Sequence, residues 1–307
     1  METAILVEGL VKRFGAVTAV AGVDFAVARG SVLGLLGRNG AGKTTIVRVL
    51  ATVLRPDAGR ARVAGRDVAR DAADVRRLIG LAGQSAAVDP NLTGAENLRL
   101  IGRLAQLPWK GARTRADELL DRFHLAEVAG RPVGTWSGGT RRRLDVAASL
   151  VHRPPVIFLD EPTTGLDLDS REDLWAMVRE LVADGVTVLL TTQYLEEADR
   201  LADRIVVIDD GRVVADDTPA ALKAQLGGTV IELGFPDEDS AAEAARTLAG
   251  AHPERDGPRL RITTRDGVRL LMDVLPRLDG QGLSPAALSV RDPSLDDVFL
   301  TVTGASR

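Results

Sequence analysis

The sequence predicts an α/β fold of the P-loop NTPase class, followed by a small α+β domain. Three observations favour this fold. Residues 37–45 match the pattern G-x-x-x-x-G-K-[ST], between an apolar run at 31–36 and a helical segment at 44–51. Residues 156–161 form a second apolar run, which ends in two adjacent carboxylates. Beyond Gly227 the pattern changes, and short strands alternate with helices.

Composition limits the functions open to the chain. It has 307 residues, 45% hydrophobic and 27% charged, which is enough for one large domain or two ordinary ones. The net charge of −4 disfavours nucleic acid as a partner, because such binding relies on excess positive charge. The lack of cysteine excludes disulfides, thiolate metal sites and thiol nucleophiles. We therefore expect no nucleic-acid partner.

The sequence also predicts a cytoplasmic location. No stretch reaches the about 18 uninterrupted apolar residues of a membrane-spanning helix. Residues 1–5 lack the basic segment and long apolar run of a secretory signal. A phosphate-binding loop, in addition, needs intracellular ATP or GTP.

The loop at 37–45 predicts a nucleotide site. Its glycines allow the backbone to close around phosphates where a Cβ would clash, and the following helix N-terminus points N–H groups at the anion. Lys43 is placed to reach the β- and γ-phosphates, and the hydroxyl of Thr44 to bind Mg²⁺. The predicted ATP-binding residues of the loop are Gly37, Asn39, Gly40, Gly42, Lys43, Thr44 and Thr45.

Residues 3–36 predict short strands separated by turns at Gly9, Gly15, Gly22 and Gly30. Phe14 stands alone there among small and polar residues. It is either a half-buried aromatic of a strand or a flat surface on which adenine stacks.

A helical insertion follows the first half of the core. Thr93 and Glu96 have the spacing of a capping box at the start of a helix. Pro108 and Gly111 separate this helix from the next. With the helix that follows, these segments predict a helical subdomain at about 85–150.

The loop Ser137-Gly138-Gly139 precedes a further helix, which Ser137 can cap. Two interpretations are open. The segment is either an ordinary capped helix with a solvated arginine cluster at 141–143, or a second anion site at a helix N-terminus.

Two polar strand ends complete the predicted site. Asp160 and Glu161 end a buried strand, where adjacent carboxylates are costly unless a cation compensates. In a P-loop protein the first acid holds Mg²⁺, and the second is placed to accept a proton from water. A strand at 186–192 ends at Gln193, which we expect near the phosphates because ligands bind at the carboxyl ends of parallel strands.

The C-terminal residues 229–307 predict a separate α+β domain without a recognisable chemical motif. The expected order is strand 229–233, helix 240–248, strand 259–264, helix 268–278, strand 288–290 and helix 295–301.

In their order and spacing these motifs resemble the ATP-binding subunits of ABC transporters. The resemblance covers residues 1–225 and rests on Gly37–Thr45, Gln84, Ser137-Gly138-Gly139, Val156–Glu161, Asp167 and Gln193. The segments 136–145 and 191–199 are most similar to drug-export ATPases of the daunorubicin-resistance type. The tail at 292–299 resembles the C-terminal extension of those subunits.

The resemblance implies an ABC ATPase core with an antiparallel β subdomain and a helical subdomain. It also implies a homodimer, in which ATP lies between the loop at 37–45 of one copy and the loop at 137–139 of the other. Asp167 then lies at the dimer interface. The helical insertion docks on an integral-membrane permease on a separate chain, which places the subunit peripherally on the cytoplasmic face of the membrane.

The resemblance further implies residue roles. Lys43, Glu161 and Gln193 are the expected catalytic residues, and Thr44, Asp160 and Gln84 the expected Mg²⁺ residues. Gln193 occupies the place of the usual switch histidine, and it can donate a hydrogen bond but cannot take a proton.

Alternative functions stay open at this point. A soluble ABC-type ATPase acting on ribosomes or DNA is disfavoured by the single P-loop, the lack of cysteine and the acidic net charge. An uptake ATPase is not separable from an exporter, because the permease sets the direction of transport.

Overall fold

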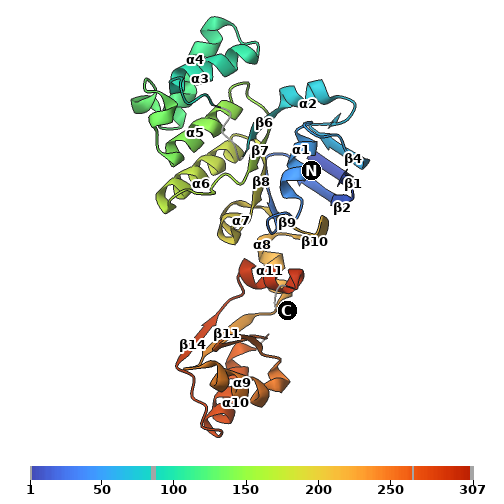
Figure 1. The fold of residues 1–307 in the computed structure, drawn as a ribbon, viewed down its shortest axis with the longest axis vertical. Helices are drawn as coiled ribbons and strands as arrows, with labels where there is room; N and C mark the ends of the chain where they lie inside the picture. The colour runs from blue at the N-terminus through green and yellow to red at the C-terminus, as the bar shows by residue number, and fades with distance from the viewer. Residues whose placement is uncertain (1, 84–87, 265, 305–307) are drawn as a thin grey trace. The chain divides into compact units, whose positions relative to one another are not determined.

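The computed structural model describes residues 2–83, 88–264 and 266–304 (Figure 1). The chain divides into two compact units, Met1–Asp217 and Thr218–Arg307. Among the described residues, no helix combines the length and the apolar character that crossing a bilayer requires.

A six-stranded sheet forms the centre of the first unit, in the order β10-β9-β3-β8-β7-β6. Its strands are β3 (Val32–Leu36), β6 (Ile79–Ala82), β7 (Val156–Asp160), β8 (Thr187–Thr192), β9 (Arg204–Asp209) and β10 (Arg212–Asp217). All pairings are parallel except that of β10, the second strand of a hairpin with β9. Every residue of β3, β7 and β8 is buried, as expected for parallel strands covered on both faces.

Alternate side chains of these strands point into two different hydrophobic clusters. In β7, Ile157 and Leu159 belong to one cluster and Phe158 to the other. The first cluster includes α5 (Gly138–Ser149) and α6 (Leu168–Ala183), and the second includes α1 (Lys43–Leu50). Figure 1 shows α5 and α6 on one side of β6, β7 and β8, and α1 on the other. The remaining helices of this sheet are α2 (Ala72–Leu78) and α7 (Leu195–Leu201).

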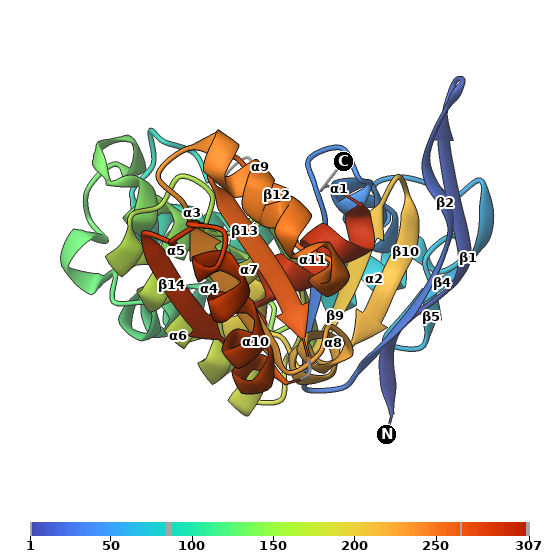
Figure 2. The same cartoon turned by 90° about the horizontal axis from the view of Figure 1, so that it is seen from below.

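The second sheet of this unit is antiparallel, in the order β2-β1-β4-β5. It contains β1 (Thr3–Phe14), β2 (Val17–Ala28), β4 (Ala58–Val63) and β5 (Arg66–Asp67), with β1 and β2 as long ribbons in Figure 2. The prediction of short strands was therefore wrong. Gly9 and Gly22 have positive φ, but they coincide with shifts in the β1–β2 register and so act as bulges within continuous strands.

The helical insertion consists of α3 (Gly94–Leu104), α4 (Trp109–Arg122) and two short 3₁₀ turns, Ala126–Val128 and Val133–Thr135. The predicted capping box of Thr93 and Glu96 is confirmed at the start of α3. Pro108 occupies the N-cap position of α4, but Gly111 lies inside that helix and does not separate α3 from α4. A glycine near a helix start is tolerated there, because α4 packs through its buried Ala112, Ala116, Leu119 and Leu120.

The second unit has a four-stranded antiparallel sheet, in the order β12-β13-β11-β14. Its elements are α8 (Pro219–Gln225), β11 (Thr229–Gly234), α9 (Glu238–Thr247), a 3₁₀ turn (Ala249–Ala251), β12 (Glu254–Asp256), β13 (Arg259–Thr264), α10 (Gly267–Asp279), β14 (Ala287–Arg291) and α11 (Leu295–Thr303). The six predicted elements are present, and α8 and β12 are additional. Ile231, Leu233 and residues of α9 and α10 form its core.

An ion-pair network ties α11 to this sheet. Arg291 lies 2.6 Å from Asp297 and 2.7 Å from Glu232. Burial alone would raise the pKa of Asp297, but hydrogen bonds from Arg291 and Ser294 lower it to about 2.

Candidate active site

The predicted strand ends meet at one edge of the central sheet. In the register of the sheet, Leu36 at the end of β3 pairs with Thr192, and Asp160 at the end of β7 pairs with Thr191. The segments that begin at Gly37, Glu161 and Gln193 therefore leave neighbouring strands side by side.

A cavity of 310 Å³ lies at this edge. It is lined by Asn39, Gly40, Gly42, Lys43, Thr44, Thr45 and Glu161. Two glycines of the loop are required by its own packing. A Cβ on Gly37 would lie 2.4 Å from the carbonyl oxygen of Ile208, and one on Gly42 would lie 2.4 Å from that of Ala19. The neighbouring backbone therefore packs closely against the loop at Gly37 and Gly42, and this packing fixes the loop beside the cavity.

Lys43 is buried within the loop. Its Nζ donates hydrogen bonds to the carbonyl oxygens of Gly37, at 2.6 Å, and Arg38, at 3.0 Å, and lies 3.8 Å from Oε1 of Glu161. Burial lowers the pKa of Lys43, and the carboxylates of Glu161 and Asp160 oppose that shift. The arrangement holds a cation beside the cavity where phosphate oxygens would lie.

Thr44 lines the same cavity, and the carboxylate of Asp160 lies against the hydroxyl of Thr44. The Thr44 hydroxyl donates to Oδ1 of Asp160 at 3.2 Å, and Thr191 donates to the same oxygen at 2.5 Å. Asp160 is buried, so the position favours a compensating cation. A hydroxyl and a carboxylate suit Mg²⁺, which keeps its other positions for phosphate oxygens and water.

Glu161 has an unusual backbone. Its φ is 49°, in the left-handed region that non-glycine residues rarely adopt. Its N–H is shared between the hydroxyl and the carbonyl oxygen of Thr191, at 3.0 and 3.1 Å. This conformation directs the carboxylate into the cavity beside Lys43 instead of along the strand.

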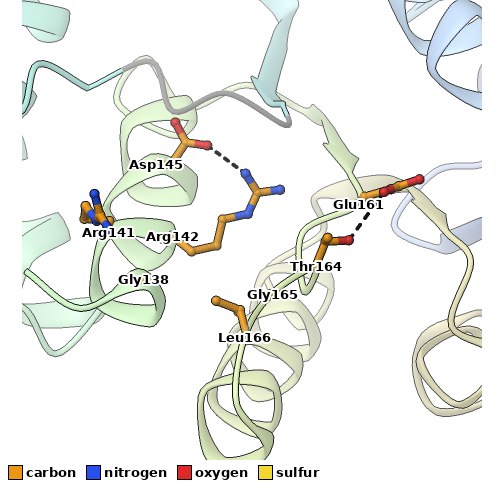
Figure 3. A pocket seen from close by; sticks show the side chains of 8 residues that line it. All are labelled: Gly138, Arg141, Arg142, Asp145, Glu161, Thr164, Gly165 and Leu166. Atoms are coloured by element: carbon orange, nitrogen blue, oxygen red, sulfur yellow. Dashed lines mark hydrogen bonds and ion pairs between the residues drawn. The ribbon is translucent and has the colours of Figure 1, made fainter.

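A second cavity, of 510 Å³, also has Glu161 in its lining (Figure 3). It is lined by Gly138, Arg141, Arg142, Asp145, Glu161, Thr164, Gly165 and Leu166. Ser137 caps α5 by accepting from the backbone N–H of Thr140 at 3.2 Å. Of the residues described, those lining the Lys43 cavity include none from 137–139. One copy therefore does not bring the two predicted anion sites together.

The other described residues predicted for the site lie on separate elements of the fold. Asp167 caps α6, and the hydrogen bond from Ser170 lowers the pKa of Asp167. Gln193 is half-buried directly after β8. Phe14 ends β1 and is 48% exposed, with Nζ of Lys12 5.5 Å from its ring centre. Gln84 lies outside the described residues.

The sequence prediction missed Arg142, which it left within a solvated arginine cluster. The structure buries this side chain beside Asp145 and the segment around Glu161 (Figure 3). The spacing of Arg142 and Asp145, one helical turn apart, was the available signal.

Comparison with known proteins decides the family. The ABC transporter family profile matches residues 20–164. The chain is 52% identical to daunorubicin resistance ATP-binding protein DrrA3 of Streptomyces coeruleorubidus, over 100% of this chain and 98% of that protein. The chain belongs to the ATP-binding subunits of ABC transporters. It is also 51% identical to daunorubicin/doxorubicin resistance ATP-binding protein DrrA of Streptomyces peucetius, over 98% of this chain and 92% of that protein.

The fold of this ABC subunit agrees with a solved relative. A dimeric ATP-binding cassette bound to ADP and Pi matches with a TM-score of 0.64 and 25% identity, over 70% of this chain and 98% of that one. The predicted ABC ATPase fold and the resemblance to the daunorubicin-resistance type are confirmed. The chain is an ABC-type ATPase that binds ATP, and the soluble ribosome or DNA role is not favoured.

Proposed function

We propose that this ATPase drives the export of a drug or another hydrophobic compound through a separate permease, as a homodimer on the cytoplasmic face of the membrane. The observation that carries this proposal is the division of the anion sites between two cavities that share Glu161. Pairing two copies head to tail supplies each Lys43 cavity with the Ser137 loop of the partner. The relatives named for drug resistance support drugs as the cargo.

In the proposed reaction the chain's own residues divide the work. Lys43 binds and orients the β- and γ-phosphates, and the 37–45 backbone supplies N–H donors. Thr44 and Asp160, with Gln84, would hold Mg²⁺, which supplies charge neutralisation at the phosphates when bound. Glu161 accepts a proton from the attacking water or orients it, and Gln193 donates a hydrogen bond toward the γ-phosphate.

The Ser137 loop completes the site in this proposal. Among the described residues, none has an atom within 4 Å of the place of a Cβ on Gly138. A phosphate of the partner's ATP can therefore approach the backbone closely at the N-terminus of α5. ATP then closes the dimer because it contacts both copies, and hydrolysis removes those contacts. The similar cassette that was solved as a dimer supports this arrangement.

A groove of 650 Å³ in the first unit is the proposed permease surface. It is lined by residues of α2, the end of α3 and His152, including Arg76, Arg77, Ile101, Leu104 and Leu107. Leu104 is 75% exposed there. A groove that combines exposed apolar side chains with two arginines suits an amphipathic helix with an acidic edge, presented by a permease.

The test is capture of a membrane protein by the purified, tagged chain. We expect the wild-type chain to retain a polytopic permease from detergent-solubilised membranes, and the transported drug to stimulate ATP hydrolysis by the complex. Leu104→Asp should lose capture, whereas Val53→Asp, at another exposed apolar position (63%), should keep it. Equal capture by both variants would remove the groove from the proposal, and a wild-type chain that captures no permease would contradict the transport role.

A further inference from the structure

Arg142 makes an unusual set of contacts for a residue of a helix surface. Its Nε donates to the carbonyl oxygen of Pro162 at 2.8 Å, and its Nη2 to that of Asp160 at 3.2 Å. Its Nη1 donates to the carbonyl oxygen of Gly83 and to Oδ2 of Asp145, the latter at 3.1 Å. One guanidinium thus joins α5 to the end of β6 and to both sides of Glu161. Figure 3 shows its pairing with Asp145.

The site is built for a guanidinium. The side chain of Arg142 is 12% exposed and that of Asp145 is 1% exposed. A buried charge is costly unless it is paired and fully hydrogen-bonded, and here the carboxylate and three carbonyls meet that need. A lysine would supply the charge, but its single ammonium cannot span carbonyls in three separate segments as the planar fork does.

Two of the three carbonyls that Arg142 binds flank Glu161. Asp160 and Pro162 are its chain neighbours, and Glu161 itself is held at a φ of 49°. A backbone in that region persists only where its surroundings over-determine it. Thr191 holds the N–H of Glu161, and Arg142 holds the carbonyls on either side.

We propose that Arg142 is a positioning residue for ATP hydrolysis, which fixes the strained backbone of Glu161 and so aims its carboxylate at the attacking water. This inference rests on the proposed function, since it assumes that Glu161 acts on water. Arg142 touches no reacting atom in this account. Its loss therefore lowers the rate of the chemical step and leaves ATP binding intact.

The experiment compares steady-state hydrolysis, ATP binding and thermal unfolding in the full chain. Arg142→Lys keeps the charge beside Asp145, and the pair Arg142→Gln with Asp145→Asn removes both charges together, so neither variant leaves a new isolated ion. We expect kcat to fall about 10- to 100-fold in both, the cost of a misplaced catalytic group. The Kd for ATP and the unfolding temperature should stay close to those of the wild type. Arg143→Gln is the matched control, because it removes an arginine of the same helix whose ion pair is made with the exposed Asp173.

Each outcome bears on the inference. A kcat within about twofold of the wild type in either variant overturns it, and recovery by lysine shows that charge alone is needed. A parallel loss of ATP binding or of folding also overturns it, in favour of a purely structural role. Glu161→Gln is measured alongside: if the wild type hydrolyses ATP and Glu161→Gln matches its rate, it is the proposed function that fails.

Discussion

The two glycines of the Ser137 loop have opposite environments, which gives a sharp prediction. At Gly138 an added Cβ meets no atom of the described part of the chain within 4 Å, but at Gly139 it would lie 2.2 Å from Oγ and 2.8 Å from Cβ of Ser170. Gly138 is also not among the described glycines with positive φ, so its backbone conformation does not require a glycine. The packing of the described residues therefore requires a glycine at 139 but not at 138, where the lack of a side chain suits the close approach of a ligand.

The expected magnitudes follow from these environments. Gly138→Ala should leave the free energy of unfolding unchanged or raise it by about 0.4–1 kcal/mol, because alanine loses less backbone entropy. Its ATPase rate should fall about 100-fold or more, since the methyl group displaces the partner's phosphate from backbone donors. Gly139→Ala should lower the free energy of unfolding by about 1–3 kcal/mol through overpacking against Ser170.

Two measurements on purified protein separate these effects. Denaturant unfolding reports stability, and phosphate release reports turnover, for the wild type and both variants. Loss of turnover with full stability in Gly138→Ala supports a ligand at this loop. Wild-type turnover in Gly138→Ala would refute the reasoning, and so would a loss of activity that merely tracks a loss of stability.

Three further predictions concern single side chains. Glu161→Gln should bind ATP, hydrolyse it very slowly and accumulate as a dimer in sedimentation experiments, and wild-type turnover would exclude its role. Gln193→His should preserve or raise the ATPase rate, so complete inactivity in phosphate-release assays would count against the proposed role of Gln193. The depressed pKa of Asp297 stabilises the second unit above the unfolded-state pKa of 3.8, and this contribution is lost as pH falls through about 2. Asp297→Asn should therefore cost about 2 kcal/mol at pH 7 and flatten the unfolding free energy between pH 4 and about pH 2, and an unchanged pH profile would exclude this linkage.

Sequence reasoning placed the candidate site at one edge of the sheet because strand ends leave clear signals. Apolar runs that stop at Gly37, Asp160 and Gln193 mark three buried parallel strands, and their carboxyl ends must share an edge. The capping box of Thr93 and Glu96 could also be predicted, because it depends only on residues close together in the sequence. By contrast, Gly9 is a bulge and not a turn, because the pairing of β1 on both sides decides its role.

Arg142 was missed for a different reason. Three consecutive arginines at 141–143 look solvated in sequence. The spacing of Arg142 and Asp145 predicts an ion pair at most, and nothing local indicates that the guanidinium meets carbonyls 18 to 59 positions away. The complete nucleotide site, as proposed, also cannot be predicted from the pattern of a single chain. Gly138 and Lys43 line different cavities in one copy, so their proposed meeting depends on a second copy.

The most direct test of the account is a structure of Glu161→Gln bound to Mg-ATP. The account predicts a two-fold dimer, with each γ-phosphate contacted by Lys43 of one copy and by Ser137 and Gly138 of the other. A structure in which ATP contacts residues of a single copy, with Ser137 facing solvent, would contradict it.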